Sequence, residues 1–334
     1  MLCLLCGCEG LFAQPTEDSG LTLKIDADLV LTDVLVEDRT THLPVGSLTA
    51  EDFQVREDGV AQRIEYLSHD TLPLSIIFLF DLTDTVRPVL KPLAAGARTV
   101  LDQLRPQDEA AVMVFYSTTQ LVQPFTRNHA LLAAAIDKAS GLTTREATFL
   151  NEVVFQATEA MAQASVAQSR HVLLFLTDGT SNVPNAALRK LYGKSAPARL
   201  HTEPEAMDAL LRSGTVAAAL IERSALSDMD ISTRYMPPFG PLMRIGPDPG
   251  NVRKYAEQSG GIVLNSSKQQ VAARMAELID ELRSRYTLGY RPTPTQPSGK
   301  LCRIDLELTK HFYNAHLDLT AKKLAIHSRT GYYR

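Results

Sequence analysis

The sequence contains no tryptophan and only four cysteines among its 334 residues. Cys3, Cys6 and Cys8 all lie within the first ten residues, so Cys302 is the only cysteine in the rest of the chain. An internal disulfide is therefore excluded from the body of the protein. Because the body of the chain has only this one cysteine, cysteine usage does not indicate the redox compartment.

Long hydrophobic runs and a strong excess of charge are also missing. After the first fifteen residues, no segment approaches the ~20 apolar residues that a membrane helix requires. The formal net charge is only -4, so nothing attracts the chain to nucleic acid or to an anionic membrane. Hydrophobic residues make up 45% and charged residues 22% of the chain. These values are typical of a globular protein with one large domain and a smaller one.

Residues 1–15 have the pattern of an export signal, being apolar with small residues near the end and a polar stretch after it. The usual basic region is missing, and a start further upstream would supply it. The segment Leu5-Cys-Gly-Cys8 also resembles a lipobox, which would place a lipid anchor on Cys8. The alternative is the frayed apolar end of a cytosolic protein. We expect an exported protein, periplasmic or extracellular.

Residues 16–71 have the pattern of an N-terminal β segment. Apolar residues alternate between Leu21 and Val36, as in a half-exposed strand. A short helical turn is predicted after Thr49, and Asp58-Gly59 indicates a hairpin. The partner strand of that hairpin is expected at 61–67. This segment alone has little core to bury.

Residues 72–285 change to an alternation of strands and helices, which is typical of a doubly wound, mostly parallel six-stranded sheet. The expected strands are 74–80, 110–116, 120–124, 171–177, 215–221 and 261–264. The expected helices are 88–104, 128–139, 148–165, 203–213, 250–259 and 267–285. The second and third strands are joined closely enough to form a hairpin, which predicts one antiparallel edge strand. Residues 224–250 are predicted to form a long loop.

Residues 286–334 alternate in the manner of β-strands. Because this segment and residues 16–71 are each too small for a good core, we expect them to pair into one small β-sandwich beside the domain inserted between them. The alternative is two independent extensions that pack on the central domain.

Polar side chains follow two buried strands of the central domain. Asp81 ends the run 74–80, and Asp178 follows the run 171–176. In open α/β sheets, ligands bind beyond the carboxyl ends of such strands. Thr83 and Thr85 follow Asp81 at intervals of two, so a curled loop could point all three side chains inward. Oxygen ligands of this kind suit a hard divalent cation, magnesium, manganese or calcium, although Asp and Thr also commonly cap helices.

The arrangement of these residues resembles a von Willebrand factor type A (VWA) domain. The metal-ion-dependent adhesion site (MIDAS) of that family uses an Asp-x-Ser-x-Ser loop, a separate threonine and an aspartate after a central strand. The loop residues correspond here to Asp81, Thr83 and Thr85, with threonine at both serine places. Thr148 corresponds to the separate threonine and Asp178 to the final aspartate. The segments flanking the domain resemble the exported "VWFA-related" proteins of Acidobacteria, whose role is uncharacterised.

This resemblance implies a Rossmann-like fold over 72–285 and a metal ligand set made of Asp81, Thr83, Thr85, Thr148 and Asp178. It also implies a non-enzymatic interaction module with a divalent cation, most simply magnesium. The partner would be a protein that presents an aspartate or glutamate side chain, and no nucleic acid would be involved. Asp84, beside these residues, is a further candidate donor to the metal.

Two other functions fit the same residues. Asp81-Leu-Thr-Asp-Thr85 also matches the loop of magnesium-dependent phosphoaspartate enzymes of the haloacid dehalogenase type, in which the first aspartate is a nucleophile. That chemistry needs a lysine that we cannot place and an aspartate where this chain has Asn182. A structural scaffold with a vestigial metal site is the third hypothesis.

Overall fold

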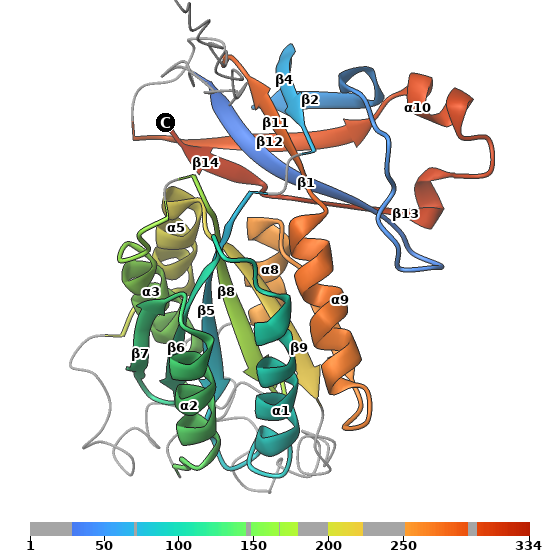
Figure 1. Ribbon diagram of the computed structural model, residues 1–334. Coiled ribbons are helices and arrows are strands. Elements are labelled where there is room, and N and C mark those ends of the chain that lie inside the picture. The colour runs from blue at the N-terminus through green and yellow to red at the C-terminus, as the bar shows by residue number, and fades with distance from the viewer. Residues whose placement is uncertain are drawn as a thin grey trace, which may run out of the picture.

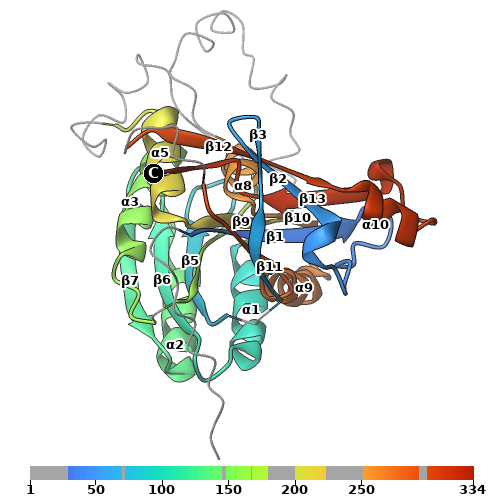
Figure 2. The ribbon, with the colours of Figure 1, turned by 90° about the horizontal axis from the view of Figure 1, so that it is seen from above.

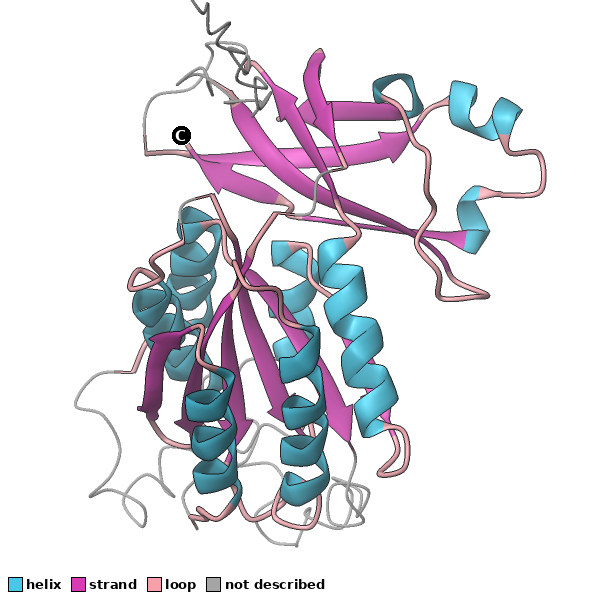
Figure 3. Ribbon diagram, viewed as in Figure 1, coloured by secondary structure: helices cyan, strands magenta, loops and turns pink. Residues whose placement is uncertain are grey.

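The computed structural model describes residues 29–69, 72–144, 148–166, 168–179, 200–222, 251–292 and 299–334. The predicted export signal with Cys8 and the predicted loop at 224–250 lie outside these residues. The chain forms a central α/β unit and an all-β unit, which lie at opposite ends of the view in Figure 1. Figure 3 shows the contrast, because helices flank the strands of one unit and are few in the other.

The central unit contains a six-stranded sheet, which confirms the doubly wound fold. Its strand order is β10-β9-β8-β5-β6-β7. All neighbouring pairs are parallel except β6 and β7, so β7 is the expected antiparallel edge strand. The strands are β5 (Leu74–Asp81), β6 (Glu109–Phe115), β7 (Thr119–Thr126), β8 (Arg170–Thr177), β9 (Val216–Glu222) and β10 (Val263–Ser266).

Helices cover both faces of this sheet, which is why its inner strands are continuously apolar. Every residue of β5 is buried. One hydrophobic cluster joins the sheet to α1 (Leu90–Val100), α2 (His129–Ser140) and α9 (Val271–Arg283). A second cluster joins the other face to α3 (Leu150–Met161), α5 (Glu203–Ser213) and α8 (Val252–Ser259). A 3-10 helix, η2 (Leu101–Gln103), extends α1.

The all-β unit consists of two four-stranded antiparallel sheets, as expected for the flanking strands. One has the order β13-β1-β11-β4 and the other β14-β12-β2-β3. Both contribute to one hydrophobic cluster and form a small sandwich. The strands are β1 (Val30–Asp38), β2 (Phe53–Glu57), β3 (Val60–Gln62), β4 (Ile64–Ser68), β11 (Tyr286–Tyr290), β12 (Leu301–Leu308), β13 (Leu324–Ser328) and β14 (Gly331–Tyr333). The short helices are η1 (Ala50–Asp52), α10 (Lys310–Ala315) and η4 (Ala321–Lys323).

Hydrogen bonds in both sheets of the sandwich join strands from the two ends of the chain. β1 pairs with β11 and β13, and β12 pairs with β2. The view from above in Figure 2 shows these strands crossing over the central unit. The chain therefore leaves the sandwich after β4, forms the central unit, and returns to the sandwich at β11.

The expected single strand at 61–67 is wrong. The strand is interrupted at Arg63, and the strands on either side of it, β3 and β4, belong to different sheets. Gln62 pairs with Val55 in one sheet, whereas Ile64 pairs with Tyr290 in the other. The hairpin itself is confirmed, because Asp58 and Gly59 both have positive φ angles, of 48° and 82°.

The carboxyl ends of the parallel strands point away from the sandwich (Figure 1). The predicted site residues therefore lie at the free end of the central unit, which we call the rim. The amino ends of β5 and β8 face the sandwich instead. Within the described residues, no helix combines the length and apolar character that crossing a membrane requires.

Candidate metal site at the rim

The rim brings Asp81 next to the end of β8. β5 and β8 are parallel neighbours, and Phe80 lies opposite Leu176 in their register. Asp81 is the last residue of β5, and Thr177 is the last residue of β8. Both side chains are buried, as is Asp178. The strand ends thus place the two predicted carboxylates at one end of adjacent strands.

The loop after β5 curls back on Asp81. Asp81 Oδ1 accepts a hydrogen bond from Thr83 N at 3.0 Å and another from Thr83 Oγ1 at 2.7 Å. The hydroxyl oxygens of Thr83 and Thr85 are 3.4 Å apart. The predicted interval of two residues therefore gathers these three side chains. The same bonds make Asp81 the organising residue of the loop, because its carboxylate satisfies both a backbone and a side-chain donor.

Thr177 also contacts the site, although the sequence interpretation did not include it. Its hydroxyl donates to the second oxygen of Asp81, Oδ2, at 2.8 Å. Thr177 Oγ1 also accepts a hydrogen bond from Gly179 N at 3.1 Å. The signal in the sequence is a hydroxyl residue at the last position of a buried strand, immediately before Asp178. Thr177 thus links the two strand ends.

Thr148 reaches the rim from a third segment. The backbone N of the next residue, Phe149, donates to the carbonyl of Tyr116 just beyond β6, at 3.3 Å. The Thr148 side chain is buried, and its hydroxyl has no hydrogen-bond partner among the described residues. An unsatisfied buried hydroxyl is unfavourable by ~1–3 kcal/mol, so a ligand oxygen or ion beside it would be stabilising.

The electrostatics of the rim disfavour two ionised carboxylates. Burial raises the pKa of Asp81 to about 7, and repulsion from Asp178 adds to this effect. The hydrogen bonds from Thr83 and Thr177 act in the opposite direction but do not cancel it. The site therefore gains from positive charge placed between the two aspartates.

Asp84 does not belong to this group of side chains. It lies on the exposed side of the loop and forms an ion pair with Arg87. Its carboxylate is therefore directed to a neighbouring guanidinium, and the expectation that it donates to the metal is not supported by this arrangement.

A further buried carboxylate, that of Glu152, lies in the first turn of α3. Glu152 accepts hydrogen bonds from the backbone N and Nδ1 of His201, at 3.0 and 2.8 Å, and from Gln156 at 2.6 Å. The His201 ring stacks on Phe155 with 3.5 Å between the centroids. These partners satisfy Glu152, which therefore anchors the chain as it enters α5.

The donor set fits a hard cation. Two carboxylates and up to three hydroxyl groups are oxygen donors of the kind that magnesium, manganese and calcium prefer. Among the described residues, no three His, Cys, Asp or Glu side chains are grouped so that they could hold a metal. A site at the rim would thus depend on the threonine hydroxyls. Thr180, Ser181 and Asn182 lie outside the described residues.

No family model matches this chain, and no curated protein matches it. Several solved structures are similar to it. BatB from Bacteroides thetaiotaomicron is 14% identical, with 62% of this chain and 98% of BatB covered and a TM-score of 0.42. The SpRpn10 VWA domain is 8% identical, with 61% and 94% covered and a TM-score of 0.40. A von Willebrand factor type A protein from Catenulispora acidiphila is 12% identical, with 84% and 74% covered and a TM-score of 0.44.

Proposed function

We propose that the rim holds a divalent cation through Asp81, Thr83, Thr85, Thr148 and Asp178, and that the protein uses it to bind an acidic side chain of a partner protein. One observation carries the proposal. Asp81 and Asp178 are both buried at the ends of neighbouring strands, and burial together with their repulsion raises the pKa of Asp81 to about 7. When bound, a divalent cation supplies the missing positive charge and an open coordination position for an outside carboxylate.

The residues of the chain have separate tasks in this proposal. Asp81 and Asp178 supply negative charge, and the three threonines supply neutral oxygen atoms. Because the hydroxyls add no charge, the two carboxylates at most balance a divalent ion, so the site does not repel an acidic ligand from outside that takes an open coordination position. Thr177 positions Asp81 through its hydrogen bond to Oδ2. The role is therefore one of binding and not of catalysis.

The proposal is tested by titrating magnesium, manganese and calcium into the full chain and following thermal unfolding. A ligand that binds only the native state at 100 times its Kd stabilises by about 2.7 kcal/mol. This corresponds to roughly 5–10 °C for a domain of this size. Asp81→Ala should abolish the shift. Asp84→Ala is the matched control, because Asp84 lies in the same loop but pairs with Arg87 at the surface.

Partner binding needs a second measurement, made with immobilised peptides that contain glutamate or, as a control, glutamine. Binding should require both glutamate and the cation. Retention in excess chelator, or by the Asp81→Ala variant, would contradict the proposal. No thermal shift with any ion would favour a structural scaffold, and turnover of a generic phosphate ester with magnesium would favour the phosphoaspartate enzyme.

Export is a separate proposal, because residues 1–15 lie outside the described part of the chain. The apolar stretch with small residues near its end supports it. N-terminal sequencing of the protein recovered from the periplasm or medium would test it. An uncleaved, cytosolic product would contradict both the signal peptide and the lipid anchor at Cys8.

A further inference from the structure

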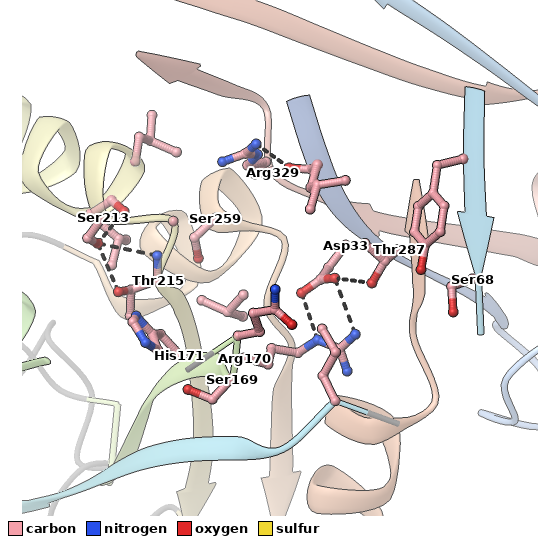
Figure 4. A pocket seen from close by; sticks show the side chains of 18 residues that line it. Asp33, Ser68, Ser169, Arg170, His171, Ser213, Thr215, Ser259, Thr287 and Arg329 are labelled. Carbon is pink, nitrogen blue, oxygen red and sulfur yellow. Dashed lines mark hydrogen bonds and ion pairs between the residues drawn. The ribbon is translucent and has the colours of Figure 1, made fainter. Parts of the chain in front are cut away.

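A cavity of about 470 Å³ lies between the sandwich and the central unit, at the end opposite the rim. Figure 4 shows its lining. Asp33 and Thr287 come from sandwich strands β1 and β11, Arg170 and His171 from the start of β8, and Arg329 from the turn before β14. The cavity is thus built by both units together and is remote from the proposed metal site.

The lining divides into an apolar part and a cationic part. Leucine, valine and tyrosine side chains provide the apolar part: Leu31, Tyr66, Leu72, Leu210, Leu211 and Val216. Arg170 and Arg329 provide the cationic part. Pockets of this size and mixed lining are typical of small-molecule sites, in which a few polar groups orient an apolar ligand.

Positive charge exceeds negative charge around the cavity. Asp33 accepts two hydrogen bonds from Arg170, at 2.7 and 3.2 Å, so these two residues neutralise each other. Arg285 is fully buried behind them, and its Nε and Nη2 have no hydrogen-bond partner among the described residues. The nearby carboxylate of Glu281 does not compensate for it at neutral pH, because burial raises the Glu281 pKa to about 8.

Arg329 is the second guanidinium that forms no ion pair with an acidic side chain of the described residues, although Asp33 attracts it at longer range. Its Nη2 donates to the carbonyl of Leu31, and its Nε is buried without a hydrogen-bond partner among the described residues. Gly214 faces it with a φ of 66°, and a Cβ at that position would lie 3.9 Å from Arg329 Nη1. The absence of a side chain at 214 therefore leaves space beside the guanidinium.

Buried charge without a counter-ion is strongly unfavourable, and an anion in the cavity would relieve it. We propose that this cavity binds a small anionic amphiphile, with its acidic head near Arg329 and its apolar chain against the leucines. The head is a carboxylate or a phosphate, which share the chemistry that a guanidinium recognises. Such a ligand would touch both units and would fix their relative position.

The test is calorimetric titration of the full chain with octanoate, octyl phosphate and octanol, in the presence of chelator. An anionic ligand should bind at least about tenfold more tightly than octanol, because only the acids can form a charge-assisted hydrogen bond with the guanidinium. Whichever of the two acids binds more tightly identifies the head group of the preferred ligand. Chelator keeps the result independent of the rim, so failure here would not affect the proposed metal site.

Variants locate the ligand. Arg329→Gln should weaken binding of the acid about tenfold, whereas Arg329→Lys should retain part of it. Ser68→Phe, which places a ring in the cavity from edge strand β4 and keeps both arginines, should abolish binding. Arg98→Gln removes an exposed arginine on α1 and is the matched control. If Arg329→Gln does not fold, the binding measured for Ser68→Phe tests the proposal on its own. Equal binding of octanol, no binding of either acid, or unchanged binding by Ser68→Phe would overturn the proposal.

Discussion

Arg170, at the first position of β8, forms a two-point ion pair with Asp33 of the sandwich, although 137 residues separate them in the chain. The Arg170 side chain is 1% exposed and that of Asp33 is 22% exposed. Arg170 also donates to the carbonyl of Leu282 at 2.8 Å. One guanidinium therefore joins the sandwich, the central sheet and the end of α9.

Asp33→Asn should destabilise the protein strongly, because it leaves the buried Arg170 without its counter-ion. Breaking a buried pair in this way costs about 3–5 kcal/mol. Asp137→Asn, which breaks the exposed pair with Arg98, should cost below about 1 kcal/mol. Denaturant unfolding of both variants measures the difference, and equal effects would show that Asp33 and Arg170 do not interact as described.

The same ion pair should make the free energy of unfolding depend on pH in the acidic range. Burial opposes ionisation of Asp33, but the charge and hydrogen bonds of Arg170 outweigh it, and the pKa of Asp33 falls below its ordinary value of 3.8. A lowered pKa in the folded state gives stability that is present above the ordinary value and is lost as pH falls through the folded value. Wild-type stability should therefore drop below about pH 4, and Asp33→Asn should drop less.

Glu281 should give the free energy of unfolding the opposite dependence on pH. Burial, followed by repulsion from Glu37 and Glu277, raises its pKa to about 8. The folded state then holds a proton that the unfolded state has lost, so stability falls as pH rises from about 4.5 to 8. Glu281→Gln should remove this slope and stabilise the protein at pH 8 by an amount on the order of a few kcal/mol. Denaturant unfolding across this range should show no such change for exposed Glu257→Gln.

Thr148→Val should separate the metal role of the hydroxyl from its packing. The two side chains have similar shape, so without metal the variant should be as stable as wild type or more stable, because a buried unsatisfied hydroxyl is lost. Its thermal shift with divalent cations should nevertheless decrease. Thr158→Val is the control: it loses the hydrogen bond to Val154, at about 1 kcal/mol, and should keep the full cation response. An undiminished shift in Thr148→Val would remove Thr148 from the ligand set.

Gly261→Ala should strongly destabilise the central unit. A Cβ at this position would lie 1.8 Å from the carbonyl oxygen of Ala217 on β9, so backbone would have to move. We expect a loss of at least about 3 kcal/mol, within the range of severe overpacking. Gly46→Ala, where no atom lies within 4 Å, should change stability by less than about 1 kcal/mol. Circular dichroism during thermal unfolding would compare the two.

The rim could be predicted because the relevant signals are local. β5 and β8 are continuous apolar runs, and their lengths define where Asp81 and Thr177 fall. The two-residue intervals to Thr83 and Thr85 are likewise visible in the sequence, and the loop hydrogen bonds follow them. Thr177 was missed because strand alternation does not tell which neighbouring strand a terminal side chain will contact.

Long-range pairing could not be predicted in the same way. The residues on both sides of Arg63 have similar alternation, and only their partners, Val55 and Tyr290, reveal that they belong to two sheets. The later start of β10 has a local cause instead: Gly261 N donates to Ala256 O and closes the turn after α8, so the strand begins only at Val263. The arginines around the cavity come from distant segments, and no spacing in the sequence relates them.

The sandwich has a consequence for how the protein is made. Asp33 on β1 must wait for Thr287 on β11, which is synthesised 254 residues later. At ~5–20 residues per second, this delay is roughly 13–50 s. During that time the central unit can fold, while the early strands have unpaired edges that invite aggregation. The exposed edges of β1 and β4 should therefore need protection by chaperones during translation, until the strands that pair with them have been synthesised.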